Sequence, residues 1–204
     1  STPVAWNRSL DAYNRNPDVT KYNHQQCHLA LNRDMPVIAI RQQGQVAAFI
    51  SLFGVHATAV GNNQTKYCAD NKGYAAVAAE QALTAQGIHA PVAIFAQATA
   101  GDVSPHYHGA NDIARRKQWQ GDSEYSYAER NGRLQAEHAL AIIQQASLPI
   151  SGALDAILTY VDLSNQHADS RFANGEPQAF TSQPCHGVAF FTGTRVDGPG
   201  MPMA

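Results

Sequence analysis

The chain has few cysteines, no long apolar run and no excess of charge of either sign. Three cysteines in 204 residues are too few and too scattered for a disulfide framework. No window approaches the ~20 consecutive apolar residues that a membrane-spanning helix requires, and the N-terminus lacks the charged start and apolar stretch of a secretory signal. Because 14 basic residues stand against 16 acidic ones, charge offers no case for a nucleic-acid partner or an anionic membrane surface.

The length and composition suit one folded region. With 44% hydrophobic residues, the chain can form one domain with a substantial core, and no repeat or linker divides residues 1–204. The first thirty residues are polar and are expected to be irregular. Two apolar, β-prone runs at 36–42 and 46–53 flank Gln43-Gly44-Gln45, which predicts a β-hairpin.

The remaining pattern alternates helices and strands. A helix is expected to begin at Asp70, which can cap it, and to end near Gly87. Ser126 and Glu129 have the spacing of a capping box, which predicts a second helix ending near Gln145. Further strands are expected at residues 91–96, 156–163 and 188–192, each an apolar, β-prone run. We therefore predict an α/β fold with a mixed sheet and flanking helices.

A serine follows the strand expected at 91–96. The run Gly101-Asp102-Val103-Ser104-Pro105 sets Ser104 on a loop, and Ser-Pro pairs alone are common turn punctuation. A serine hydroxyl is a poor nucleophile until a base or a metal activates it. Because the sequence contains neither a familiar Ser/His/Asp order nor a Gly-x-Ser-x-Gly elbow, a metal is the more natural helper.

Histidines offer candidate metal ligands. His56 comes directly after the strand at 46–53, where an imidazole can reach zinc, although one histidine makes no site and backbone groups commonly satisfy such a ring. His106 and His108 would share a face if extended, but we expect them to be solvated because they lie on a polar loop. The stretch from His24 to His28 lacks a partner cysteine pair and is a weak match.

Three motifs together resemble a known family, the neutral/alkaline non-lysosomal ceramidases. Their order, and the opening and closing segments around them, carry the resemblance: Asn7 to Tyr13 with Asn16-Pro17, Phe53-Gly54-Val55-His56, Asp70 to Ala75, Gly101 to Pro105, and Asp197 to Gly200. The resemblance implies that the chain is the central part of a larger catalytic domain. It also implies that His56 is a zinc ligand and Ser104 the catalytic nucleophile.

The family's other zinc ligands come from an upstream His-Thr-His segment and from a downstream Glu and Tyr, which this sequence does not contain. We therefore expect an incomplete zinc site and no activity in this chain alone, which is either a piece of a larger protein or a shortened homologue. The implied reaction is zinc-dependent hydrolysis of ceramide, or of a similar N-acyl lipid, to sphingosine and a fatty acid. The resemblance also implies a secreted or periplasmic protein with peripheral membrane contact.

Two departures from the family pattern leave the substrate open. His106 stands where the family usually has Asn, and the residues after His56 become Ala57-Thr58-Ala59-Val60. A related metal-dependent amidase or esterase acting on a non-sphingolipid substrate is therefore an alternative. A catalytically inactive binding homologue is another.

Overall fold

The structure of the protein is a computed structural model that describes residues 3–106, 119–145, 148–185, 193–194 and 198–199, and every structural statement refers to these. His108 and the strand predicted at 188–192 lie outside the described residues. None of the described helices has the length and apolar character needed to cross a membrane.

The central sheet is mixed, as predicted. Strands β2 (Val37–Gln42), β3 (Gln45–Phe53) and β4 (Val92–Gln97) lie in the order β2-β3-β4, with β2 antiparallel and β4 parallel to β3. The predicted hairpin is confirmed, and its turn residues Gln43 and Gly44 have φ angles of 51° and 81°. Positive φ at both turn residues matches the right-handed twist of the strands that they join.

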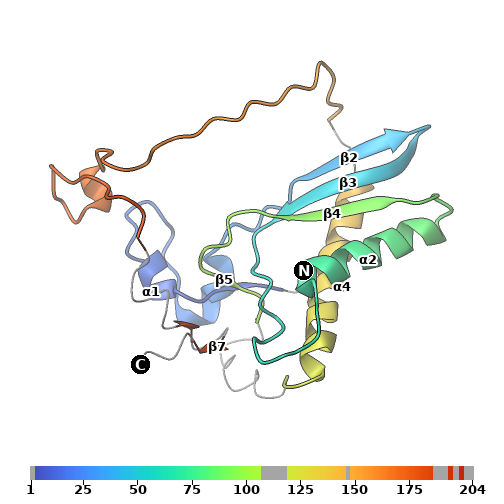
Figure 1. Ribbon diagram of the computed structural model, residues 1–204, viewed down its shortest axis with the longest axis horizontal. Helices are drawn as coiled ribbons and strands as arrows, with labels where there is room; N and C mark the ends of the chain where they lie inside the picture. The colour runs from blue at the N-terminus through green and yellow to red at the C-terminus, as the bar shows by residue number, and fades with distance from the viewer. Residues whose placement is uncertain (1–2, 107–118, 146–147, 186–192, 195–197, 200–204) are drawn as a thin grey trace.

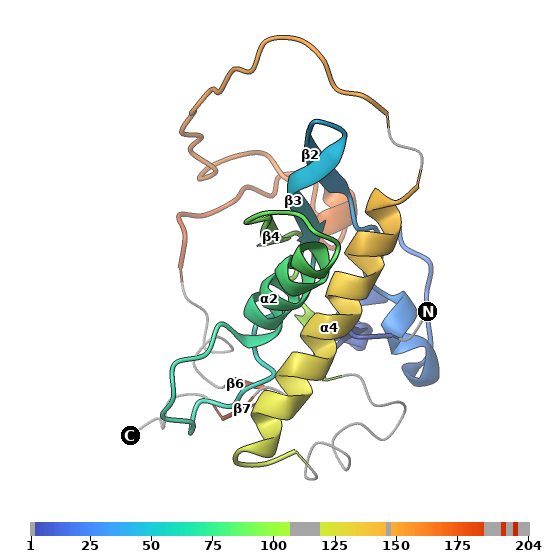
Figure 2. The same ribbon diagram turned by 90° about the vertical axis from the view of Figure 1, so that its right-hand side faces the viewer.

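Two helices cover one face of this sheet. Helices α2 (Asp70–Ala85) and α4 (Ser123–Ile143) lie side by side against it (Figures 1 and 2). Among the described residues, those buried in the core between the sheet and the helices are apolar: Val46, Phe49, Ala75, Ala79, Leu83, Ala93, Phe95, Ala136, Ala139 and Ile143. Because alanines dominate the helical side of this core, the helices approach the aromatic side chains of β3 and β4 closely. The α/β prediction is therefore confirmed.

A second, two-stranded sheet ties the N-terminal segment to the region of Ser104. Strand β1 (Trp6–Asn7) pairs antiparallel with β5 (Val103–Ser104). The first thirty residues also form helix α1 (Leu10–Tyr13) and the 3-10 helix η1 (His24–Leu29), so the prediction of purely irregular structure there is wrong. Side chains of Leu10, Cys27 and Ala30 form a small core of their own between these elements.

Both helices begin differently from the capping patterns. The N-cap of α2 is Ala69 and not Asp70, whose φ of 51° is left-handed. Helix α4 begins at Ser123, earlier than predicted, so Glu129 lies inside the helix and forms an ion pair with Arg133 at 2.7 Å. In each case a tertiary contact replaces the local cap, because the first-turn carboxylates of both helices bind backbone N–H groups of the 57–61 segment.

The prediction of a strand at 156–163 is wrong. The segment from residue 148 onward runs away from the sheet (Figure 1) and is extended, with Leu154, Ile157 and Tyr160 between 89% and 100% exposed. A run of apolar, β-prone residues becomes a strand only when a neighbouring strand supplies hydrogen bonds, and this segment pairs with none among the described residues. The described residues beyond it form an isolated bridge between His167 and Phe180, the 3-10 helix η2 (Ser170–Phe172), and the short strands β6 (Gly193–Thr194) and β7 (Gly198–Pro199).

Candidate active site

His56 is held by the residue that precedes Ser104. The backbone N–H of His56 donates to the carbonyl oxygen of Val103 at 3.2 Å, and its ring Nδ1 lies 2.9 Å from the same oxygen. A carbonyl oxygen can only accept, so Nδ1 carries the proton and the lone pair of the neutral ring is on Nε2. The structure therefore brings together the two segments that carry the predicted site residues, which lie far apart in the sequence.

Ser104 lies in strand β5 opposite Trp6 and not on a plain loop, which corrects the sequence-based expectation. Its side chain is 0% exposed, and its Oγ accepts a hydrogen bond of 3.3 Å from the backbone N–H of His106. Antiparallel pairing with β1 fixes the main chain at Val103 and Ser104. The Ser104 side chain is therefore enclosed by neighbouring groups.

His106 is buried, so the prediction that it is solvated is wrong. Only 2% of it is exposed, its Nε2 lies 2.6 Å from the carbonyl oxygen of Thr58, and its ring stacks on Tyr127 of α4 with centroids 5.5 Å apart. The hydroxyl of Tyr127 donates to the carbonyl oxygen of Pro105 at 2.5 Å. Sequence reasoning missed this arrangement because the helix that buries His106 follows it by some twenty residues.

Asp70 organises the segment after His56. Its carboxylate accepts hydrogen bonds from the backbone N–H groups of Val60, at 2.8 Å, and Asn71, at 2.6 Å. Burial raises the pKa of the Asp70 carboxyl, while these hydrogen bonds lower it in part. A left-handed φ at a non-glycine residue is strained and persists only where surrounding contacts stabilise it. For Asp70, those contacts are the hydrogen bonds that its buried carboxylate accepts from Val60 and Asn71.

Lys72 lies beneath the end of β3. Its Nζ donates to the carbonyl oxygen of Phe53 at 2.7 Å and to Oε1 of Gln135 at 3.0 Å. Burial lowers the pKa of Lys72 from 10.5 to about 8. Lys72 of α2 thus binds both α4 and Phe53, the last residue of β3, which precedes His56 by three positions.

The Lys72 pKa makes stability depend on pH. Between pH 8 and 10.5 the unfolded chain holds the lysine proton more tightly than the folded one, so we expect the free energy of unfolding to rise with pH across this window. The gain from this one group is about 3 kcal/mol. Denaturant unfolding of wild type and Lys72→Met at several pH values measures it, because the methionine variant should lack that part of the rise.

Lys66→Met is the matched control, since the Lys66 side chain is 70% exposed and its removal should leave the pH dependence unchanged. The assignment is wrong if the stability difference between wild type and Lys72→Met is constant from pH 8 to pH 10.5.

The described residues do not form a whole metal site, and His56 is the candidate ligand that they contain. Among them, no group of three or more His, Cys, Asp or Glu side chains could hold a metal ion. His56 itself fits a ligand role: a metal-binding histidine commonly donates its other ring N–H to a carbonyl, which fixes the ring and its tautomer, and Val103 provides that carbonyl.

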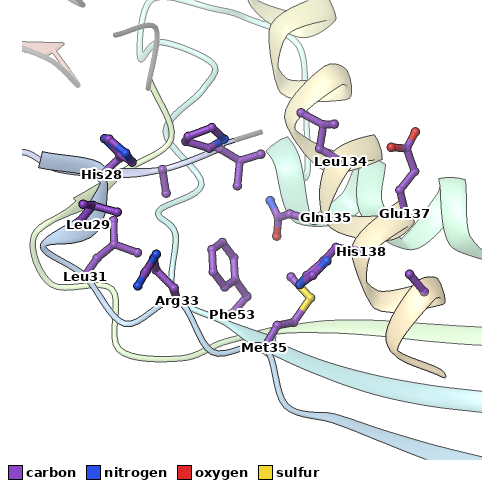
Figure 3. Close-up of a pocket in the computed structure, with 14 residues that line it drawn as sticks. His28, Leu29, Leu31, Arg33, Met35, Phe53, Leu134, Gln135, Glu137 and His138 are labelled. Carbon is purple, nitrogen blue, oxygen red and sulfur yellow. The ribbon is translucent and has the colours of Figure 1, made fainter. Parts of the chain in front are cut away.

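A cavity of about 600 Å³ lies between the N-terminal segment, the end of β3 and α4. Figure 3 shows its lining, which is apolar at Met35 and Phe53 and carries the polar side chains of Arg33 and His138. Neither His56 nor Ser104 lines it. The cavity is therefore separate from the His56–Val103 contact.

The fold is that of a ceramidase catalytic region. The structure superimposes on a solved chain described as "Ceramidase complexed with C2" with a TM-score of 0.68 and 28% identity, covering 87% of this chain and 26% of that one. Its TM-score with the crystal structure of neutral ceramidase from Pseudomonas aeruginosa is 0.66, at 29% identity, covering 86% and 26%.

The chain belongs to the neutral/alkaline non-lysosomal ceramidase family, because the model of that family's N-terminal region matches residues 2–203. Its sequence is 30% identical over 198 residues to neutral ceramidase of Pseudomonas aeruginosa and 28% identical over 218 residues to neutral ceramidase B of Dictyostelium discoideum. Both alignments cover 95% of this chain but only 27% and 30% of those relatives. The predicted family is thus confirmed, and the chain spans less than a third of the relatives' length.

Proposed function

We propose that this chain carries the nucleophile and one zinc ligand of an enzyme that hydrolyses the amide bond of ceramide. The observation that carries the proposal is the double hydrogen bond from His56 to Val103, the residue next to Ser104. It supports a shared site because it leaves the imidazole Nε2 available beside the strand that presents the serine. The names of the relatives, neutral ceramidases from bacteria and an amoeba, support the choice of substrate.

In the proposed reaction, Ser104 Oγ attacks the carbonyl carbon of the N-acyl group, and the hydroxyl proton passes to the departing nitrogen. Sphingosine leaves, and water then hydrolyses the acyl ester to release the fatty acid and restore the hydroxyl. Nε2 of His56 would be one ligand of a zinc ion, and the bound ion would supply a positive charge that polarises the substrate carbonyl. The remaining ligands are proposed to lie outside the described residues.

Removal of zinc is expected to abolish ceramide hydrolysis by the full-length gene product, and added zinc should restore it. The 204-residue chain by itself should bind zinc weakly and show no turnover, because its described residues offer one ligand where a catalytic site needs three. Metal analysis and release of fatty acid from ceramide measure both. Stoichiometric zinc together with turnover in the 204-residue chain would show that its own residues complete the site.

The substrate distinguishes the proposal from a related amidase or esterase. The ring of His106 lies 2.6 Å from the carbonyl oxygen of Thr58, two residues after His56, so the departure of His106 and of the segment 57–60 from the family pattern bears on the substrate. A panel of ceramides, other N-acyl amides and simple esters should show the fastest hydrolysis with ceramides. Faster turnover of a non-sphingolipid substrate would favour the alternative, and no turnover of any member would favour a binding homologue.

We further propose that the protein is secreted or periplasmic and that it contacts membranes peripherally. Fractionation of the source cells tests the first, and sedimentation of the full-length gene product with ceramide-containing vesicles tests the second.

A further inference from the structure

Three buried amide side chains form a continuous hydrogen-bonded chain between α2 and α4. Asn71, Asn131 and Gln135 are 0%, 3% and 1% exposed. At the centre, Nε2 of Gln135 donates to Oδ1 of Asn71 at 3.3 Å and to Oδ1 of Asn131 at 2.8 Å. Gln135 therefore joins the two asparagines by its own two N–H groups.

The outer ends of this amide chain bind the two segments of the proposed site. Nδ2 of Asn71 donates to the carbonyl oxygen of His56 at 2.9 Å. Nδ2 of Asn131 donates to the carbonyl oxygens of Pro105, at 3.2 Å, and of Val4, at 2.8 Å. One end thus holds the backbone of His56, and the other holds the residue that follows Ser104.

Close approach of the helices makes the chain possible. A Cβ added at Gly132 of α4 would lie 2.5 Å from the carbonyl oxygen of Asn71 and 2.7 Å from the backbone nitrogen of Ala75. Only glycine permits this distance between the helix backbones, and it places Asn131 and Gln135, one turn apart on α4, against Asn71. A buried polar network that is only half satisfied is less stable than an apolar core, so apolar side chains would be the simpler way to pack these helices. The presence of three hydrogen-bonded amides here therefore suggests a role beyond packing.

We propose that Gln135 is a positioning residue that sets the distance between His56 and Ser104. It does so by fixing Asn71 and Asn131, and through them the backbone on either side of the site. The inference deepens the proposed ceramidase function and rests on it for the catalytic readout. Gln135 itself touches neither of the reacting side chains and is not a catalytic residue.

Gln135→Glu is the sharpest test. The carboxylate keeps the shape of the side chain and still accepts from Lys72, but it cannot donate to the oxygens of Asn71 and Asn131. In the full-length gene product we expect kcat for ceramide to fall on the order of 100-fold, as a displacement of about 1 Å between reacting groups does, with KM nearly unchanged. If Gln135→Glu does not fold, Gln135→Met provides the same test, because the methionine side chain is similar in size and has no hydrogen-bond donor.

A second readout does not depend on activity. In the 204-residue chain, ¹⁵N NMR should show the His56 ring protonated at Nδ1, and Gln135→Glu should show a mixture of tautomers because the contact with Val103 loosens. If the wild type does not hydrolyse ceramide, the proposed function fails while this comparison still decides the role of Gln135.

Two controls at the C-terminal end of α4 separate positioning from other effects. Gln144→Glu makes the same chemical change at an exposed position, and Ile143→Ala removes core packing without touching the amide chain. Both should keep wild-type kcat and the Nδ1-protonated ring below their unfolding temperatures. A kcat within twofold of wild type for Gln135→Glu, or an unchanged His56 spectrum, would overturn the inference.

Discussion

Ser104→Ala is expected to lower ceramide hydrolysis by the full-length gene product by more than about 1000-fold, while the protein still folds. The substitution removes the proposed nucleophilic oxygen and, with it, the 3.3 Å hydrogen bond that this oxygen accepts from the backbone N–H of His106. Loss of that bond should change the free energy of unfolding by about 1 kcal/mol or less. Fatty-acid release and thermal unfolding of the two proteins measure the two effects separately.

Ser51→Ala is the matched control. Ser51 of β3 is also 0% exposed, and its Oγ has no hydrogen-bond partner among the described residues. The same loss of one buried hydroxyl should therefore leave hydrolysis at the wild-type rate. Residual activity of Ser104→Ala near that of Ser51→Ala would remove Ser104 from the reaction and leave an activated water as the nucleophile.

Gly54→Ala is expected to destabilise the fold by about 3 to 5 kcal/mol. A Cβ at Gly54 would overlap the carbonyl oxygen of Thr99 and lie 2.9 Å from its carbonyl carbon. Both are backbone atoms and cannot rotate away, so the segments after β3 and β4 must separate. Their separation also strains the two hydrogen bonds between the backbone of Val55 and the side chain of Gln97, at 2.9 and 2.6 Å.

Gly101→Ala makes the same substitution in the segment that leads to Ser104. A Cβ there meets nothing within 4 Å, and the φ of Gly101 is not left-handed. Its free energy of unfolding should stay within about 0.5 kcal/mol of wild type. Urea unfolding of both variants measures the difference, and equal stabilities would show that the close approach at Gly54 relaxes at little cost.

The part of the fold that follows from local pattern was predictable. The β2-β3 hairpin, the helix from 70 toward 87 and the strand after it depend on periodicity and turn residues that lie within each segment. Helix starts were less predictable, because Asp70 and Glu124 bind backbone groups of the 57–61 segment instead of capping their own helices. The segment 156–163 shows where prediction from local pattern fails. Its residues favour a strand, but whether a free sheet edge lies beside them depends on the tertiary structure.

The candidate site divides in the same way. His56 and Ser104 were identified from short motifs and a family resemblance, which name residues without giving their distance. The burial of His106 and the amide chain through Gln135 had little signal in the sequence. The one available hint is the four-residue spacing of Tyr127, Asn131 and Gln135, which places polar side chains along a helix face whose neighbours are alanines.

By itself the sequence determined the family, the mixed α/β character and the residue types on which the proposed chemistry depends, because contiguous motifs and the spacing of apolar residues carry this information. Only the tertiary structure decided that the imidazole of His56 binds the carbonyl beside Ser104, and that buried amides from two helices hold both segments. Those contacts join residues dozens of positions apart, and their geometry follows from how closely the helices and strands can pack, which no local pattern encodes.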